Sequence, residues 1–219
     1  MSELAAAVLA TARAMNASGI NRGAAGNVSA RTADGFLITP TGMAYDRCVP
    51  EDMVKVSASG TAQGRRKPSS EWRFHRDIYA MRKDAGAIIH AHSPFATALA
   101  CQQLAIPPFH YMIARFGGDT LRCARYATFG TQELSAAIIE ALEGRRACLM
   151  AHHGMVVYGR DLDEALALAI EFEALCEQYW RVLQLGAPKL LPPEEMARVI
   201  EKFKDYGVQD VVPPEADRR

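Results

Sequence analysis

GAIIHAHSPFA, residues 86–96, is a short apolar run that carries two histidines, His90 and His92, and ends in Ser93-Pro94. Such a run predicts a buried strand, and residues two apart on a strand project from the same face. Both imidazoles would then point at one spot, as a strand presents two nitrogen ligands to a metal ion. The alternative is a pair of solvated or hydrogen-bonded histidines at a strand end. Serine followed by proline predicts that a helix begins directly afterwards.

The rest of the chain alternates in the same way between strands and helices. Helical spacing or capping signals predict helices at 3–18, at 69–83, after Ser93, at 131–144, at 161–186 and at 192–207. Short β-like segments are predicted at 27–32, 34–39, 52–57 and 85–92, and in an apolar strand at 146–159 that a histidine pair interrupts. Helices interleaved with many short strands favour an α/β fold, a three-layer αβα sandwich, over a helical bundle.

Composition narrows the class of protein. The 219 residues carry 25 basic and 25 acidic side chains, so no basic stripe indicates a nucleic-acid partner. No apolar run is long enough to cross a membrane, and Glu3 stands where a signal peptide needs positive charge. Five scattered cysteines without a C-x-x-C indicate neither a disulfide framework nor a zinc ribbon. We therefore expect one cytoplasmic domain, residues 1–219, without linker or repeat.

The third candidate ligand lies in LMAHHGMVV, residues 149–157. On a regular strand His152 and His153 lie on opposite faces, so at most one of them faces the same site as His90 and His92. Gly154 leaves room for a close backbone approach or an irregular turn. Three imidazoles with an open fourth position are what a catalytic zinc needs, and no cysteine is suitably placed for a structural zinc site.

Glu71 is the obvious carboxylate partner, in the first turn of a helix that begins PSSE. The alternative is a surface glutamate at the positive end of the helix dipole. Ser69 and Ser70 add hydroxyls at the same helix start, which suits a phosphate. The loops GNVS (26–29) and TPTG (39–42) could converge on that anion, although Gly-Asn and Thr-Pro are also ordinary turn residues.

Eight motifs in this order carry a resemblance over roughly residues 3–207: GNVS, ITPTG, PSSEWRFH, IIHAHSPFATALA, HYMIARFGG, YATFGT, AHHGMVVYG and EKFKDYG. Together they resemble the class II aldolase/adducin family. The resemblance implies a central, mainly antiparallel sheet flanked by helices. It also implies a homotetramer with active sites at the subunit interfaces.

The resemblance further implies roles for individual residues. His90, His92 and His153 would bind one Zn²⁺ per subunit, with Glu71 as catalytic acid/base. Tyr111 would be supplied by the neighbouring subunit to the aldehyde end of the substrate. Phosphate binding is implied for Gly26, Asn27, Thr41, Gly42, Ser69 and Ser70. Phe129, Phe203 and Tyr206 would lie around the aldehyde pocket. The last two would belong to a mobile C-terminal segment, which is expected from about residue 205.

The activity implied is the reversible cleavage of a ketose 1-phosphate to dihydroxyacetone phosphate and an aldehyde. The ketose would be of the L-fuculose 1-phosphate, 5-deoxyribulose 1-phosphate or 5-methylthioribulose 1-phosphate type. Arg115, Phe116 and Arg122 depart from the family pattern near Tyr111 and leave the aldehyde open. The alternatives are a pentulose-5-phosphate 4-epimerase, a methylthioribulose-1-phosphate dehydratase and a non-catalytic, adducin-like interaction module. Retention of Glu71 and all three motif histidines argues against the last.

Overall fold

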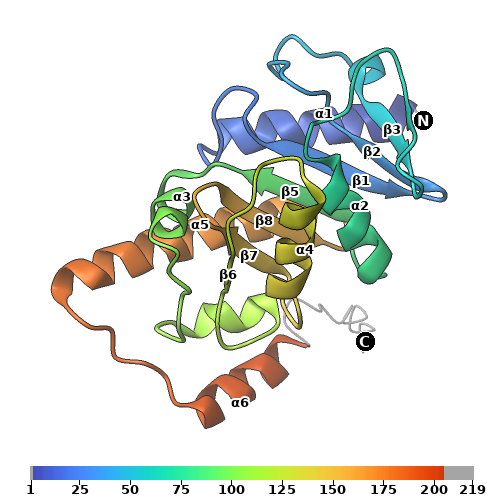
Figure 1. The fold of residues 1–219 in the computed structure, drawn as a ribbon. Helices are drawn as coiled ribbons and strands as arrows, with labels where there is room; N and C mark the ends of the chain where they lie inside the picture. The colour runs from blue at the N-terminus through green and yellow to red at the C-terminus, as the bar shows by residue number, and fades with distance from the viewer. Residues whose placement is uncertain (1, 205–219) are drawn as a thin grey trace, which may run out of the picture.

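The computed structural model describes residues 2–204 of the chain. Six α-helices, eight strands and two 3₁₀ segments follow one another in these residues (Figure 1). The helices are α1 (Ser2–Ala17), α2 (Trp72–Met81), α3 (Pro94–Cys101), α4 (Gln132–Ala141), α5 (Leu162–Leu185) and α6 (Pro193–Phe203), and the 3₁₀ segments are η1 (Pro50–Asp52) and η2 (Tyr111–Phe116). The strands are β1 (Asn27–Thr32), β2 (Gly35–Ile38), β3 (Val54–Ser57), β4 (Ala62–Gln63), β5 (Ala87–Ala91), β6 (Cys123–Ala124), β7 (Ala147–Met150) and β8 (Gly154–Gly159).

All eight strands join one sheet in the order β4-β3-β2-β1-β5-β8-β7-β6. Every neighbouring pair is antiparallel except β6 and β7, which are parallel. The strand predicted from GAIIHAH is β5, and it lies in the middle of the sheet. His90 is paired with Asn27 on one side and with Val156 on the other. The GAIIHAH segment is therefore held by hydrogen bonds to a neighbouring strand on each side.

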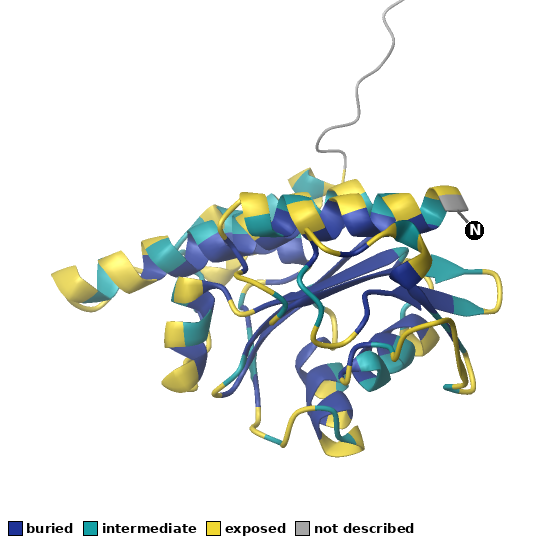
Figure 2. Cartoon of the chain, turned by 90° about the horizontal axis from the view of Figure 1, so that it is seen from above, coloured by how far each residue is buried: buried dark blue, intermediate teal, exposed yellow. Residues whose placement is uncertain are grey.

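Helices cover both faces of the sheet, so the fold is the predicted three-layer sandwich (Figures 1 and 2). Alternate residues of β5 enter different cores: Ile89 packs with α1, α3 and α5, and Ile88 packs with α2 and α4. Figure 2 shows buried strands between helices that are buried on their inner sides and exposed on their outer sides. His90 alternates with Ile89, so its imidazole lies on the α2 and α4 side, edge-on to Phe74.

Two expectations about local structure were wrong. The apolar run at 146–159 is a hairpin of two antiparallel strands, with Ala151, His152 and His153 as its turn. Helix α2 begins at Trp72 instead of Ser69, because residues 69–72 form a turn in which Trp72 N donates to Ser69 O. Glu71 thus occupies the N-cap position of α2, just outside the helix. The two-residue strands β4 and β6 were not predicted.

Among the described residues, no helix combines the length and the apolar character that crossing a membrane would need. Tyr206 and the expected mobile segment from about residue 205 lie outside the described residues.

Candidate metal centre

Four side chains from three separate segments of the chain meet at one point. His90 lies in β5 and His92 directly follows it, His153 ends the β7–β8 turn, and Glu71 immediately precedes α2. Each offers one ligand atom, and these four atoms all lie within 4.8 Å of one another. The strand spacing therefore brings His90 and His92 to a shared site, as predicted. His153 reaches this site because it lies in the hairpin turn, and not through the alternation of side chains along a strand.

The contacts between these groups are short. Glu71 Oε2 lies 3.1 Å from His90 Nε2, and Glu71 Oε1 lies 3.1 Å from His153 Nε2. The Nε2 atoms of His90 and His92 are 3.1 Å apart. The three imidazole rings stand edge to face, with centroids 4.8–4.9 Å apart. The cluster is therefore already gathered around a common centre.

This arrangement fits a bound cation better than a set of hydrogen bonds. His90 Nδ1 donates to the carbonyl oxygen of Met155 at 2.8 Å, so in a neutral ring Nε2 turns a lone pair toward the centre. Glu71 Oε1 is buried and accepts no well-directed hydrogen bond, although His153 Nε2 lies near it. Convergent lone pairs and an unsatisfied buried carboxylate oxygen are what a divalent cation would satisfy.

Burial and mutual charges shift the pKa values of three groups in the cluster. Burial raises the pKa of the Glu71 carboxyl, but the His90 and His153 imidazoles outweigh burial and hold that pKa well below its usual range. Burial lowers the pKa of His90, and the Glu71 carboxylate more than reverses this. Burial, together with His90 and His153, lowers the pKa of His92 to about 4. Near neutral pH the centre therefore offers a carboxylate and a neutral His92 imidazole.

The three loops expected to bind phosphate lie side by side, next to Glu71. Asn27 Nδ2 donates to Ser69 Oγ at 3.0 Å and to Glu71 Oε2 at 3.1 Å. Pro40 and Pro68 form an isolated antiparallel bridge, and Thr41 N donates to Lys67 O at 3.1 Å. The segments GNVS, TPTG and PSS, far apart in sequence, therefore form one continuous surface.

Within that surface the expected residues differ in exposure. Asn27 and Ser69 are buried, whereas Thr41, Gly42 and Ser70 are exposed. Gly26 is buried, and a Cβ there would overlap the backbone oxygen of His90. The packing therefore requires glycine at position 26. Gly42 has φ +67, a left-handed conformation that favours glycine.

A pocket of about 290 Å³ opens onto the cluster. Phe129 lines it, together with Ser70, Glu71, His92 and His153. Tyr126 and His152 also line it, and sequence reasoning missed both in this position. Their rings meet edge to face at 5.8 Å. His152 lies outside the four-residue metal cluster, in line with its expected exclusion from the ligand set.

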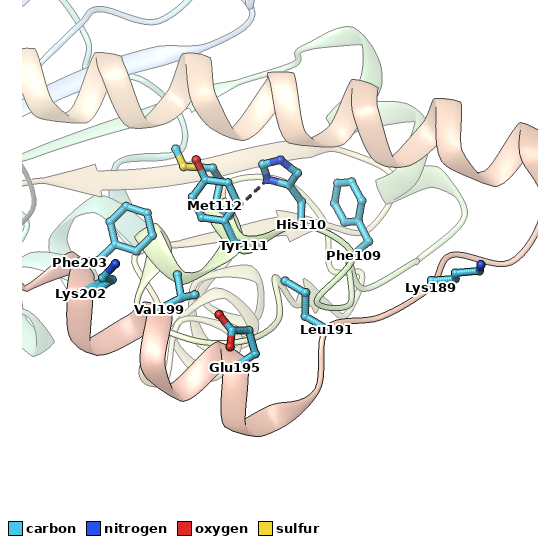
Figure 3. Close-up of a pocket in the computed structure, with 10 residues that line it drawn as sticks. All are labelled: Phe109, His110, Tyr111, Met112, Lys189, Leu191, Glu195, Val199, Lys202 and Phe203. Atoms are coloured by element: carbon cyan, nitrogen blue, oxygen red, sulfur yellow. Dashed lines mark hydrogen bonds between the residues drawn. The ribbon is translucent and has the colours of Figure 1, made fainter.

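Tyr111 and Phe203 lie in a different pocket, of about 560 Å³, between η2 and α6 (Figure 3). Their rings are stacked with centroids 6.4 Å apart, and the Tyr111 side chain is exposed. None of the residues that line this pocket also lines the pocket at the metal cluster. The structure therefore does not bring Tyr111 or Phe203 to the metal cluster of their own chain.

A buried carboxylate and three converging imidazoles lie beside a polar pocket. This combination is typical of one class of protein, a metalloenzyme of α/β fold, and the chain is a candidate member of that class. Comparison with known proteins makes the assignment more specific. Residues 6–180 match the family described as Class II Aldolase and Adducin N-terminal domain. The chain belongs to this class II aldolase and adducin family.

Individual relatives carry aldolase names. The chain is 55% identical over 90% of its length to a 5-methylthioribulose-1-phosphate/5-deoxyribulose-1-phosphate aldolase of Rhodospirillum rubrum, of which 89% is covered. It is 44% identical over 94% of its length to the L-fuculose phosphate aldolase of Escherichia coli K12, of which 97% is covered. A solved structure of an L-fuculose 1-phosphate aldolase superposes with a TM-score of 0.90 at 37% identity, covering 93% of this chain and 97% of that one.

Proposed function

We propose that this chain is a metal-dependent aldehyde-lyase that reversibly cleaves a ketose 1-phosphate to dihydroxyacetone phosphate and an aldehyde. The observation that carries the proposal is the cluster of Glu71, His90, His92 and His153 in contact with Asn27 and Ser69. It joins a cation site and an acid/base at one pocket, and Asn27 and Ser69 of the proposed anion-binding surface lie against them. The aldolase names of relatives at 55% and 44% identity support the same activity.

We propose zinc as the metal, one ion per subunit, because three imidazoles with a vacant position are the donor set of catalytic zinc sites. Held by His90, His92 and His153, zinc would supply Lewis-acid stabilisation of the negative charge that develops on the substrate. The protein's own part is to hold the three imidazoles in place, and His90 is held by its hydrogen bond to Met155 O.

Glu71 is proposed to move the proton at C3. In cleavage Glu71 accepts the proton that leaves the C4 hydroxyl, the C3–C4 electron pair passes to C3, and Glu71 returns the proton to C3, which completes dihydroxyacetone phosphate. Glu71 Oε1 accepts no hydrogen bond, whereas Oε2 is held by Asn27 Nδ2. We therefore assign the proton transfer to Oε1, with Oε2 as the fixed end of the carboxylate.

The phosphate end of the substrate is proposed to bind at the three-loop surface of Gly26, Asn27, Thr41, Gly42, Ser69 and Ser70. The exposed Thr41, Gly42 and Ser70 would meet the anion first, and backbone N–H groups with hydroxyls are its usual donors. Fixing this end places the C3–C4 bond of the sugar over the cluster, which lowers the entropic cost of reaching the transition state.

Tyr111 and Phe203 are proposed to act in a neighbouring subunit of a homotetramer, because they lie outside the metal pocket of their own chain. Tyr111 would donate to the oxygen that becomes the aldehyde carbonyl. Met112, Leu191 and Val199 line the same pocket as Tyr111 and give the aldehyde end apolar surroundings. With the R. rubrum relative, this favours a 5-deoxypentulose 1-phosphate that carries hydrogen or a methylthio group at C5.

The substrate is expected to be cytoplasmic, since a phosphate dianion does not enter the apolar interior of a bilayer unaided. We propose the same location for the enzyme, with no nucleic-acid partner.

A panel of purified ketose 1-phosphates tests the proposal: 5-methylthioribulose, 5-deoxyribulose and L-fuculose 1-phosphates, ranked by kcat/KM with a coupled assay for dihydroxyacetone phosphate. We expect release of dihydroxyacetone phosphate from the zinc-loaded protein, with both 5-deoxypentulose phosphates ahead of L-fuculose 1-phosphate. Conversion without dihydroxyacetone phosphate would favour the dehydratase or epimerase reading instead. Undiminished turnover by fully chelated protein would contradict metal-dependent cleavage.

A further inference from the structure

A network of buried polar groups extends from Glu71 away from the pocket, through the interface between α2 and the sheet. His75 Nε2 lies 2.5 Å from Asn27 Oδ1, and His75 Nδ1 lies 2.7 Å from Ser29 Oγ. Ser29 Oγ in turn lies 2.8 Å from the Tyr79 hydroxyl. His75 and Ser29 are completely buried. The residues that line the pocket at the metal cluster do not include Ser29, His75 or Tyr79.

The Glu71 carboxylate at one end of this network fixes the direction of every hydrogen bond in it. Asn27 Nδ2 uses both hydrogens, one on Glu71 Oε2 and one on Ser69 Oγ. A reversed amide would place Asn27 Oδ1 against the carboxylate oxygen, which is repulsive. Asn27 Oδ1 must therefore accept, and its partner His75 must carry its proton on Nε2.

The remaining contacts fix that tautomer. A neutral His75 with a proton on Nε2 accepts at Nδ1, so the Ser29 hydroxyl donates to it and accepts from Tyr79 in turn. The ring is also held in place, because Phe74 stacks on it with centroids 4.7 Å apart and Phe36 stacks at 6.3 Å. Two aromatic rings and the contacts of both nitrogens thus hold His75 in one arrangement.

We propose that His75 is a positioning residue that acts through the Asn27 amide to hold both the Glu71 carboxylate and the Ser69 hydroxyl. Loss of the Nε2 donor would free the Asn27 amide to turn and would remove the donor from Glu71 Oε2. Groups that orient metal ligands in this indirect way typically contribute about 10–100-fold to metal affinity or activity. The kinetic consequence rests on the proposed function, whereas the consequence for metal binding does not.

Two substitutions of similar polarity separate positioning from packing. In His75→Gln the amide nitrogen reaches the place of Nε2 and can still donate to Asn27. In His75→Asn the amide ends at the place of Nδ1 and can meet only Ser29. Ile78→Val, on the same helix and in the same core, is the control for a general loss of stability. Ser29→Ala is a further variant, with a smaller change in volume, should both His75 variants fail to fold.

The experiment measures the zinc affinity of the metal-free proteins by competition with a chromogenic chelator, with no substrate present. We expect His75→Asn to bind zinc about 10-fold or more weakly than His75→Gln, and His75→Gln and Ile78→Val to stay within about threefold of the parent. Ser29→Ala is expected to weaken binding at least about fivefold.

Equal affinities for His75→Gln and His75→Asn would overturn the proposal, since packing alone would then explain His75. If neither His75 variant folds, unchanged zinc affinity in Ser29→Ala overturns it instead. A parent protein that binds zinc but releases no dihydroxyacetone phosphate would count against the proposed function alone. In the zinc-loaded proteins kcat is expected to fall in the same order as the affinities.

Discussion

Two adjacent histidines illustrate how much a single backbone angle decides. His153 takes part in the metal cluster, whereas His152 has φ +54 and turns its ring to Tyr126 and to the Gln103 side chain. The left-handed conformation at His152 closes the β7–β8 turn and directs the next side chain toward β5. The AHHG segment is thus a turn that supplies one ligand.

The same substitution at these two neighbours should have opposite consequences for zinc. His153→Asn is expected to weaken zinc binding at least about 10-fold, because the third imidazole is lost. His152→Asn should leave the zinc content unchanged, since asparagine tolerates a positive φ and position 152 offers no ligand. Elemental analysis after dialysis against a weak chelator checks both variants. Zinc loss in His152→Asn with retention in His153→Asn would reverse the assignment.

Glu71→Gln keeps the size of the side chain and removes its ability to hold a proton. We expect kcat to fall by about 10²–10⁴-fold, the usual contribution of a positioned acid/base. At saturating zinc the variant should stay loaded, because the three histidines remain, although loss of the carboxylate charge should weaken its zinc affinity. Steady-state kinetics at equal zinc content is the measurement. Turnover close to that of the parent would remove Glu71 from the proton transfer.

At the residue scale the sequence predicted what depends on local spacing. His90 and His92 share a face because they lie two apart on a strand, and that expectation was confirmed. His75 lies in the middle of α2 and is completely buried. Its partners Asn27 and Ser29 lie 48 and 46 positions away in sequence. No local pattern indicates such a pairing, so the network could be seen only in three dimensions.

At the element scale, α3 is held by a carboxylate from another helix. Ser93 occupies the N-cap position of α3 as predicted, but its side chain makes no cap hydrogen bond to the helix. Instead the buried Glu173 of α5 accepts from Ser93 Oγ and from the backbone N–H groups of Phe95 and Ala96. The helix that follows His92 therefore starts at a point fixed by α5.

Removal of that carboxylate should destabilise the protein far more than removal of a surface one. Glu173→Ala leaves two helix-terminal N–H groups and a buried hydroxyl without partners, at a cost of about 2–4 kcal/mol. That cost corresponds to a fall in Tm of about 5–15 °C for a chain of this size. Glu177→Ala, on the same helix, loses only an exposed pair with Arg181, worth about 0.5 kcal/mol. Comparable melting temperatures in a thermal scan would contradict the role given to Glu173.

Most elements were predictable because their signals are local. The helices at α1, α4 and α5 follow apolar spacing and end signals, and the side chains of Thr131 and Asp161 accept N-cap hydrogen bonds. The hairpin at 146–159 was missed because both of its strands are continuously apolar, with no turn residue except Gly154 at its end. Strands β4 and β6, at two residues each, exist only through pairing with neighbours.

At the scale of the whole molecule, the residues expected in one active site occupy two separate pockets. Glu71 lines the pocket at the metal cluster, and Tyr111 lines the pocket between η2 and α6. Sequence alone cannot say whether such groups meet within a chain or between chains, because only subunit packing decides it. The homotetramer proposed above accounts for the separation, and one domain per subunit is expected to unfold in a single transition.

Mixed oligomers test this arrangement. Glu71→Gln and Tyr111→Phe are each expected to be nearly inactive as pure proteins. When the two variants are unfolded, mixed and refolded together, some sites combine an intact Glu71 with an intact Tyr111 from a neighbour. Activity well above the sum of the two pure variants is expected in the coupled assay. No recovery in verified mixed oligomers would show that both groups act within one chain.

The central claim, a metal ion bound by three imidazoles, is tested most directly by anomalous X-ray scattering from zinc-loaded crystals, with data collected on both sides of the zinc absorption edge. We expect one strong peak per subunit, about 2.0–2.1 Å from the Nε2 atoms of His90, His92 and His153. A map of the fully loaded, active protein with no zinc peak between these imidazoles, or with its only peak elsewhere, would contradict it.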